Sequence, residues 1–142
     1  MVVRSLQWTK DQTAFVPEID AEHQSMFLLL QELRQAVLEG ERQQLGSRLD
    51  SFTVEVTRHF RHEEKLMLAT RYSAFAWHRQ QHETARTKLA CLSECTRGDE
   101  RSSIMQAFES VVEWLRDHTG VADRMFGAHL RNYRRERAAA RA

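Results

Sequence analysis

The stretch of sequence that decides the fold is residues 59–64, which read His59-Phe60-Arg61-His62-Glu63-Glu64. His59 and Glu63 are four residues apart, so on a helix both side chains leave the same face, about one turn apart. They continue a run of side chains spaced alternately by four and three, whose apolar members are Leu45, Leu49, Phe52, Val56 and Leu66. The pattern predicts a helix whose buried stripe carries an imidazole and a carboxylate where leucines would be expected.

A buried carboxylate beside an imidazole needs a compensating partner. Removing such charges from water costs on the order of several kcal/mol when nothing offsets it. A metal ion offsets both groups at once, since a carboxylate and a neutral imidazole are each metal ligands. The stripe therefore predicts a metal site inside the protein.

Three further segments show the same helical spacing. Their stripes are His23, Met26, Leu30, Leu33 and Val37 in the first; Phe75, His78, His82, Ala85, Leu89 and Leu92 in the third; and Ile104, Phe108, Val111, Leu115 and His118 in the fourth. The second helix, which holds His59 and Glu63, should extend from about Arg42 to Ala69.

Capping residues and glycines predict where the other helices begin and end. Asp20 is the expected N-cap of the first helix, which Gly40 ends, and Ser73 is the expected N-cap of the third. Gly120 is expected to break the fourth helix. A short C-terminal helix should follow, from Val121 to about Arg137.

Four helices of roughly 20 to 28 residues joined by short turns indicate an all-α fold, an antiparallel up-down-up-down four-helix bundle. We expect this domain to cover residues 19–130. Residues 1–18 should form an extended N-terminal arm, with Trp8 and Phe15 as packing anchors. Residues 131–142 form a basic C-terminal tail with five arginines and one glutamate, interpreted as a solvated end.

In such a bundle the stripe histidines of all four helices fall at one end, because helices that alternate in direction bring starts and ends together. The candidate ligands in this layer are His23, His59, Glu63, His78, His82, His118 and Asp123. His118 and Asp123 are five residues apart and do not share a face of a regular helix. They can meet only if the helix is distorted between them, and Gly120 is where distortion is tolerated.

Five imidazoles and two carboxylates exceed the four ligands of a structural zinc ion. With one bridging hydroxide and both carboxylates bridging, they fill all but one position of two six-coordinate ions. A nitrogen-rich set suits iron, leaves manganese or zinc possible, and does not suit calcium or magnesium. An open position on a reduced iron pair suits a small ligand that accepts two electrons, of which dioxygen is the obvious example.

Motifs of other chemistries are missing from the sequence. There is no H-E-x-x-H, phosphate-binding loop or G-x-S-x-G, so we expect no catalytic residue and no enzyme. The Glu-x-x-His signature of carboxylate-rich di-iron proteins is also missing. The imidazole-rich set therefore favours reversible binding over oxygen activation.

With these residues in place, the chain resembles the hemerythrins, and in particular the single-domain bacteriohemerythrins, from about Leu6 to Phe126. The matching motifs are Ile19-Asp20-x-x-His23, His59-Phe60-x-x-Glu63-Glu64, His78-x-x-x-His82, and Trp114-Leu115-x-x-His118 with Asp123. The resemblance implies a non-haem di-iron centre, bridged by hydroxide or oxide, with dioxygen as its ligand. It implies oxygen carriage, storage or delivery.

The resemblance also implies a role for each ligand. His78, His82 and His118 would hold the coordinatively saturated iron, His23 and His59 the iron with the open position, and Glu63 and Asp123 would bridge the two. The positions that match the family's oxygen pocket are Met26, Phe60, Trp114, Leu115 and Thr119.

Thr119 stands where the family usually has isoleucine. A hydroxyl near the pocket could bind water or the ligand and shorten the life of the oxygenated protein. The alternative is that the hydroxyl bonds to a carbonyl one turn back and only the methyl faces the pocket. The family's usual Tyr-Pro before the third helix is here Tyr72-Ser73, which should affect only that turn.

Several side chains have plainer interpretations. We expect His62 and His129 at the surface, Glu64 as a surface carboxylate or a support for a ligand, and Trp77 as part of a core or pocket wall. Cys91 and Cys95 do not have the spacing of a C-x-x-C motif and are expected to be small, partly buried helix residues.

Composition excludes some functions and locations. The 21 basic and 20 acidic residues nearly balance, which gives no indication of a nucleic-acid partner. The longest apolar run, 26–30, is far shorter than the roughly 20 residues of a membrane span. No signal-peptide pattern is present, so we expect a cytoplasmic protein.

Two other functions are alternatives to oxygen carriage, storage or delivery: a sensor module, and a di-iron enzyme that acts on nitric oxide or peroxide. The sequence does not indicate a protein partner.

Overall fold

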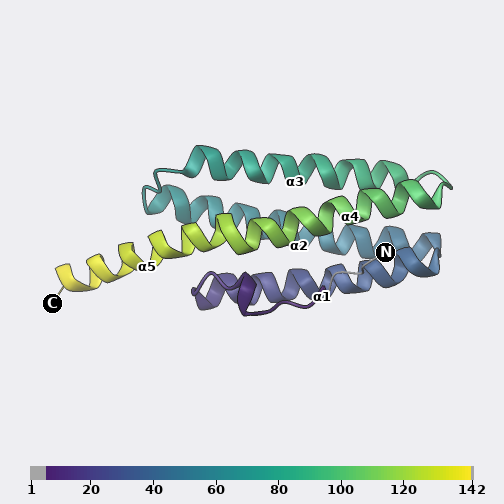
Figure 1. The fold of residues 1–142 in the computed structure, drawn as a ribbon. Helices are drawn as coiled ribbons and strands as arrows, with labels where there is room; N and C mark the ends of the chain where they lie inside the picture. Colours follow the sequence, from purple (N-terminus) through teal and green to yellow (C-terminus); the bar gives the residue numbers. More distant parts are fainter. Residues whose placement is uncertain (1–5, 142) are drawn as a thin grey trace.

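The structure, a computed structural model, describes residues 6–141, and every regular element in that range is helical. The elements are η1 (Lys10–Gln12), α1 (Pro17–Glu39), α2 (Arg42–Ala69), α3 (Phe75–Thr96), α4 (Arg101–Asp117), η2 (His118–Ala122) and α5 (Asp123–Ala140). The helices α1 to α4 run antiparallel as a bundle, and α4 continues through η2 into α5 (Figure 1). The predicted all-α four-helix bundle is confirmed.

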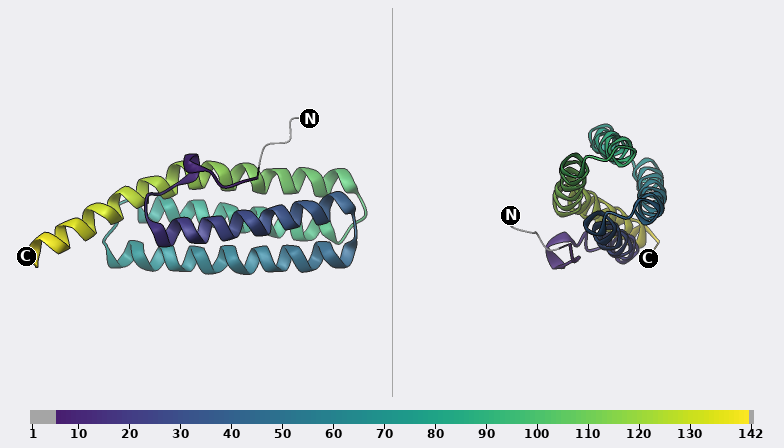
Figure 2. Two further views of the ribbon diagram at one scale, coloured as in Figure 1. Left: turned by 90° about the horizontal axis from the view of Figure 1, so that it is seen from below. Right: turned by 90° about the vertical axis from the view of Figure 1, so that its right-hand side faces the viewer.

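The four bundle helices form a ring when viewed along their axes (Figure 2). Helix α1 packs against α2, α2 against α3, α3 against α4, and α4 against α1. The last turns of α5 extend beyond the end of the bundle (Figure 2), and the described part of the arm, residues 6–16, contacts α1 and passes over η2. None of the helices formed by residues 6–141 has the length and apolar character needed to cross a membrane.

Two hydrophobic clusters of unequal size fill the bundle. The main core includes Met26, Phe60, Ala85 and Leu115, and extends to the far end of the bundle through residues such as Leu92. The smaller cluster, here called the end core, consists of Ala14, Val16, Ile19, Met67, Phe126 and Leu130. Along each bundle helix the candidate ligands fall between a residue of the end-core region and a residue of the main core, so the polar layer lies between two apolar ones.

Two predicted helix caps are wrong. Helix α1 begins at Pro17, whose fixed φ suits the first helical position, and Val16 precedes it. The Asp20 carboxylate instead accepts hydrogen bonds from Thr13 Oγ1 (2.5 Å) and the Ala14 amide (2.8 Å), so it holds the arm. Helix α3 begins at Phe75, and its N-cap, Ala74, has no side-chain hydrogen bond.

The predicted break at Gly120 is also wrong, although a distortion is present there. The chain makes a π-helical turn, η2, in which the Asp123 amide donates to the His118 carbonyl five residues back. Because the backbone remains hydrogen-bonded through this turn, the chain is helical without a gap from α4 through η2 into α5, and α5 bends away from the line of α4 (Figure 2). Helix α5 runs to Ala140 rather than ending near Arg137.

Two of the expected packing residues differ from prediction. Trp8 is half-buried against the main core, but Phe15 is 56% exposed and is not a packing anchor in the apolar interior. Trp77 is also 45% exposed, so it is not a core wall. Cys91 is exposed and Cys95 is half-buried, and both are free thiols.

Gly127 and Gly46 should respond oppositely to substitution by alanine. A Cβ at Gly127 would overlap the carbonyl oxygen of Ala14, a backbone atom that cannot move aside alone. Gly127→Ala should therefore lower the free energy of unfolding by about 1–3 kcal/mol. Gly46 lies in α2 with nothing within 4 Å of the place that a Cβ would take, so Gly46→Ala should raise stability by about 0.5–1 kcal/mol. Denaturant unfolding of the metal-free variants measures both, and equal signs would contradict this packing.

Candidate metal centre

The structure brings all seven predicted ligand side chains together in one buried layer, and none is more than 3% exposed. They form two groups that share their carboxylates. One group is Glu63, His78, His82, His118 and Asp123, and the other is His23, His59, Glu63 and Asp123. Within each group the potential ligand atoms lie within 4.8 Å of one another, which is close enough for one ion to contact all of them.

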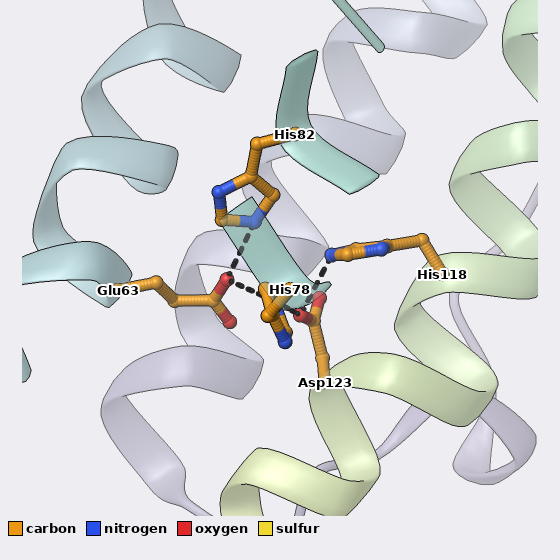
Figure 3. A group of neighbouring side chains, drawn as sticks. All are labelled: Glu63, His78, His82, His118 and Asp123. Carbon is orange, nitrogen blue, oxygen red and sulfur yellow. Dashed lines mark hydrogen bonds and ion pairs between the residues drawn. The ribbon is translucent and has the colours of Figure 1, made fainter. Parts of the chain in front are cut away.

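Asp123 directs one oxygen to each group. Its Oδ2 lies 2.9 Å from Nε2 of His23. Its Oδ1 lies 3.0 Å from Nε2 of His78 and 2.9 Å from Nε2 of His118. Figure 3 shows the Asp123 carboxylate pointing into the space enclosed by the imidazoles of the larger group.

Glu63 divides its oxygens in the same way. Its Oε2 lies 3.5 Å from Nε2 of His59 in the smaller group. Its Oε1 lies 3.2 Å from Nε2 of His78 and 3.1 Å from Nε2 of His82 (Figure 3). Each carboxylate thus faces both groups, and every inward nitrogen is an Nε2.

The π-helical turn explains how His118 and Asp123 reach the same layer. A regular α-helix advances about 100° per residue, so two residues five apart point in clearly different directions. The wider turn at η2 brings the two side chains to the same side, where the His118 Nε2 and Asp123 Oδ1 atoms meet at 2.9 Å. Single π turns of this kind occur often at functional sites.

Several inward atoms of the layer have no hydrogen-bond partner among the described residues. They include Nε2 of His118, Oε2 of Glu63 and both carboxylate oxygens of Asp123. These nitrogen and oxygen atoms lie only about 3 Å apart but are not aligned as donor and acceptor. They converge on a common point, as the ligands of a metal ion do. Because buried polar groups are almost always paired, these orphaned atoms fit the coordination of metal ions.

The charges of the layer compensate one another in the metal-free protein. Burial lowers the pKa of His59, but Glu63 and the hydrogen bond to Glu22 outweigh burial and raise it to about 10. Burial also lowers the pKa of His78, but the neighbouring carboxylates of Asp123 and Glu63 outweigh burial and raise it to about 9. Burial raises the pKa values of Glu63 and Asp123, but the neighbouring imidazoles hold both well below their usual range. Protons on imidazoles therefore balance the two buried carboxylates.

Two carboxylates outside the layer orient ligand imidazoles. Glu22, which sequence reasoning missed, accepts from His59 Nδ1 at 2.7 Å and also bonds to Nδ1 of the partly exposed His62. Burial raises the pKa of Glu22, and its bonds to the two imidazoles outweigh this and lower it. The only sequence signal was its place beside His23. Glu64 lies 3.1 Å from His82 Nδ1, which matches its expected supporting place.

Aromatic rings line the main-core side of the layer. Phe60 stacks on His82 with ring centroids 3.9 Å apart, and Trp114 stacks on His118 at 4.4 Å. The other apolar residues predicted for the pocket, Met26 and Leu115, are buried. His129, expected at the surface, is bonded to Thr70 and lies outside both ligand groups.

Thr119 is fully buried, and its hydroxyl donates to the Leu115 carbonyl at 2.9 Å, one turn back. The same hydroxyl lies 3.2 Å from the Arg116 carbonyl. Of the two arrangements considered for this residue, the structure has the hydrogen bond of the second. The expectation of a hydroxyl free to act in the pocket is therefore wrong, because the backbone accepts its proton.

Comparisons with known proteins agree with the fold and with one family. A curated relative, the bacteriohemerythrin of Methylococcus capsulatus, is 27% identical over 111 residues, which are 78% of this chain and 85% of the relative. A solved structure of wild-type hemerythrin superposes with a TM-score of 0.78 at 24% identity, covering 91% of this chain and 98% of that one. A solved hemerythrin mutant matches equally, with a TM-score of 0.78, 24% identity, and coverage of 92% and 98%.

The family comparison covers most of the sequence. Residues 14–130 match the family described as the Hemerythrin HHE cation binding domain. This range contains all seven predicted ligand side chains and the carboxylates of Glu22 and Glu64. The chain belongs to the hemerythrin family.

Proposed function

We propose that this protein binds dioxygen reversibly at a non-haem di-iron centre, for oxygen carriage, storage or delivery. One observation carries the proposal: Glu63 and Asp123 each turn one oxygen toward each of two imidazole groups. A single metal ion does not need that arrangement, whereas two ions side by side need carboxylates that bridge them. The membership of the family supports iron as the metal.

Different residues of the chain would bind each of the two iron ions. His78, His82 and His118 would hold one iron and His23 and His59 the other, with Glu63 and Asp123 shared. When bound there, a ferrous pair would supply the two electrons that a small ligand such as dioxygen accepts. Glu22 and Glu64 fix which nitrogen of His59 and His82 faces inward, because each carboxylate accepts the Nδ1 proton.

The surroundings of the layer favour release of oxygen unchanged. The main core and the end core shield the two sides of the layer from water. The predicted pocket is mainly apolar, and the hydroxyl of its Thr119 is already bonded to the backbone. The other pocket residues are Met26, Phe60, Trp114 and Leu115. Loss of the bound ligand as hydrogen peroxide would need protons, and these residues supply none. Binding is therefore favoured over turnover of peroxide or nitric oxide.

The two free thiols support a reducing compartment, the cytoplasm, as the place of action. A free thiol pair and a ferrous centre are both retained best where oxidation is held back. Dioxygen is the partner that the site supports, and no described surface assigns a protein partner.

Reversibility is the decisive test of the function. The purified protein should take up about two iron ions per chain, and the reduced form should change its visible spectrum in air and recover it on deoxygenation, because the proposed site holds a pair with one open position. Metal analysis and repeated oxygenation cycles measure this. Glu63→Ala should lose both ions together, since Glu63 faces both groups. His129→Ala, a histidine outside both groups, should retain them; a single bound ion or an irreversible change would contradict the proposal.

The metal-free protein should lose stability as pH rises. The pKa values of His59 and His78 are raised from 6.5 to about 10 and about 9, so the stability that their protons contribute is complete below pH 6.5 and lost as pH rises through those values. The melting temperature measured from pH 6 to 10 should fall across this window. The zinc-loaded protein serves as the comparison, because metal replaces those protons and its melting temperature should fall less. A flat profile for the metal-free protein would contradict this balance of charges.

Thr119→Val should not change the rate of autoxidation in air by more than about twofold, because the hydroxyl that it removes already donates to the Leu115 carbonyl. Side-by-side decay of the two oxygenated proteins at one pH measures this. A much slower decay of the valine variant would mean that the hydroxyl does reach the ligand.

A further inference from the structure

The outer face of the π-helical turn is covered by residues 9–15 of the N-terminal arm, here called the arm segment (Figure 2). Arg124 holds most of it. The Arg124 guanidinium donates to the backbone carbonyls of Lys10 (3.1 Å), Asp11 (2.9 Å) and Thr13 (3.0 Å). Three carbonyls bonded by one side chain fix both the position and the direction of the arm segment, because the donors of a guanidinium form a rigid fork.

The end of the arm segment is held just as closely. Arg131 donates to the Ala14 carbonyl at 2.6 Å, and the guanidinium groups of Arg124 and Arg131 lie 5.5 and 5.3 Å from the centre of the Phe15 ring. Phe15 has a φ of 57°, in the left-handed region that non-glycine residues rarely adopt. Such a conformation persists only where the surrounding contacts determine it. Gly127 permits this approach, since a Cβ there would meet Ala14.

The arm segment joins two helices that contribute ligands. On one side Asp20 of α1 binds Thr13 and Ala14. On the other side Arg124 follows directly after Asp123, whose carboxylate points inward and is 0% exposed. The contacts of Arg124 on the outside and of Asp123 on the inside therefore act on the same short piece of backbone.

This piece of backbone needs external support. A π turn has poorer geometry than an α turn and is kept only where something favours it. If η2 relaxed to a regular α turn, the residues after it would rotate by about 100° relative to α4, and His118 and Asp123 could no longer both face the layer. Asp123 is also shared by both groups, so its displacement would affect both at once.

We propose that Arg124 is a positioning residue for the metal pair: by clasping the arm segment it keeps the π turn and directs the Asp123 carboxylate into the layer. This inference rests on the proposed di-iron site. Arg124 touches no ligand group and acts only through the backbone of Asp123. Loss of the Arg124 contacts would free the backbone of Asp123. The hydrogen bonds of His59 with Glu22 and of His82 with Glu64 would remain.

The test compares metal release with local and global stability. Iron-loaded Arg124→Ala should release its metal to an excess of a chelator roughly 10- to 100-fold faster than the unmodified protein, with both ions lost together. Arg124→Lys keeps the charge but not the three-carbonyl fork, so it should also release metal faster. Arg134→Ala removes an arginine of the same helix that pairs with Glu18 and not with the arm segment, so its release rate should be unchanged.

Leu92→Ala separates a positioning role from general destabilisation. Leu92 is fully buried in the main core, far along α3 from the ligands, so its loss lowers global stability without touching the arm segment. Release from Arg124→Ala should be faster than from Leu92→Ala even when the melting temperature of Leu92→Ala is the lower one. Release rates that simply follow the melting temperatures, or equal rates for Arg124→Ala and Arg134→Ala, would overturn the proposal.

Amide hydrogen exchange of the metal-free proteins gives a second readout that does not depend on iron. Arg124→Ala should lose protection in residues 118–124 while α2 and α3 keep theirs. Unchanged protection in 118–124 would overturn the clasp. If the unmodified protein binds no metal pair, the proposed function fails, and the exchange comparison still decides whether Arg124 holds the π turn.

Discussion

The structure depends on one constraint: two buried carboxylates must each face two groups of imidazoles at the same time. Glu63 and Asp123 are fully buried, and the imidazoles around them are nearly so. In a layer shielded from solvent, an inward polar atom without a partner costs free energy, because nothing replaces the hydrogen bonds that it made with water. The positions of the ligand helices and of the turn between α4 and α5 follow from this requirement.

The bundle meets the constraint by combining regular and irregular elements. Regular spacing is sufficient for His59 with Glu63 and for His78 with His82, since residues four apart share a helix face. It is not sufficient for His118 with Asp123, and there the chain adopts the π turn of η2. Supports outside the layer then act on individual ligands: Glu22 on His59 and Glu64 on His82 by hydrogen bonds.

The sequence predicted the features that periodicity determines and missed those that depend on contacts between distant segments. The stripes placed four helices and brought the histidines to one end, because burial enforces the three-and-four spacing. The distortion near Gly120 was foreseen, since five residues cannot span one helix face, but its continuous π form was not. Asp20 has the side chain of a typical N-cap residue. Only the fold shows that its carboxylate instead accepts a hydrogen bond from Thr13 of the arm. Glu22 lies off the stripe, and its partner His59 is on another helix, so no local pattern marks it.

The end core has a consequence for the order of events during synthesis. Ala14 and Val16 come from the beginning of the chain, whereas Phe126 and Leu130 come from near its end. A nascent chain that has emerged as far as His118 already carries all five ligand histidines but still lacks Asp123 and the cover over that side of the layer. Contacts between such distant segments form late, because they must close a long loop. The layer is thus closed on both sides only after α5 has emerged from the ribosome.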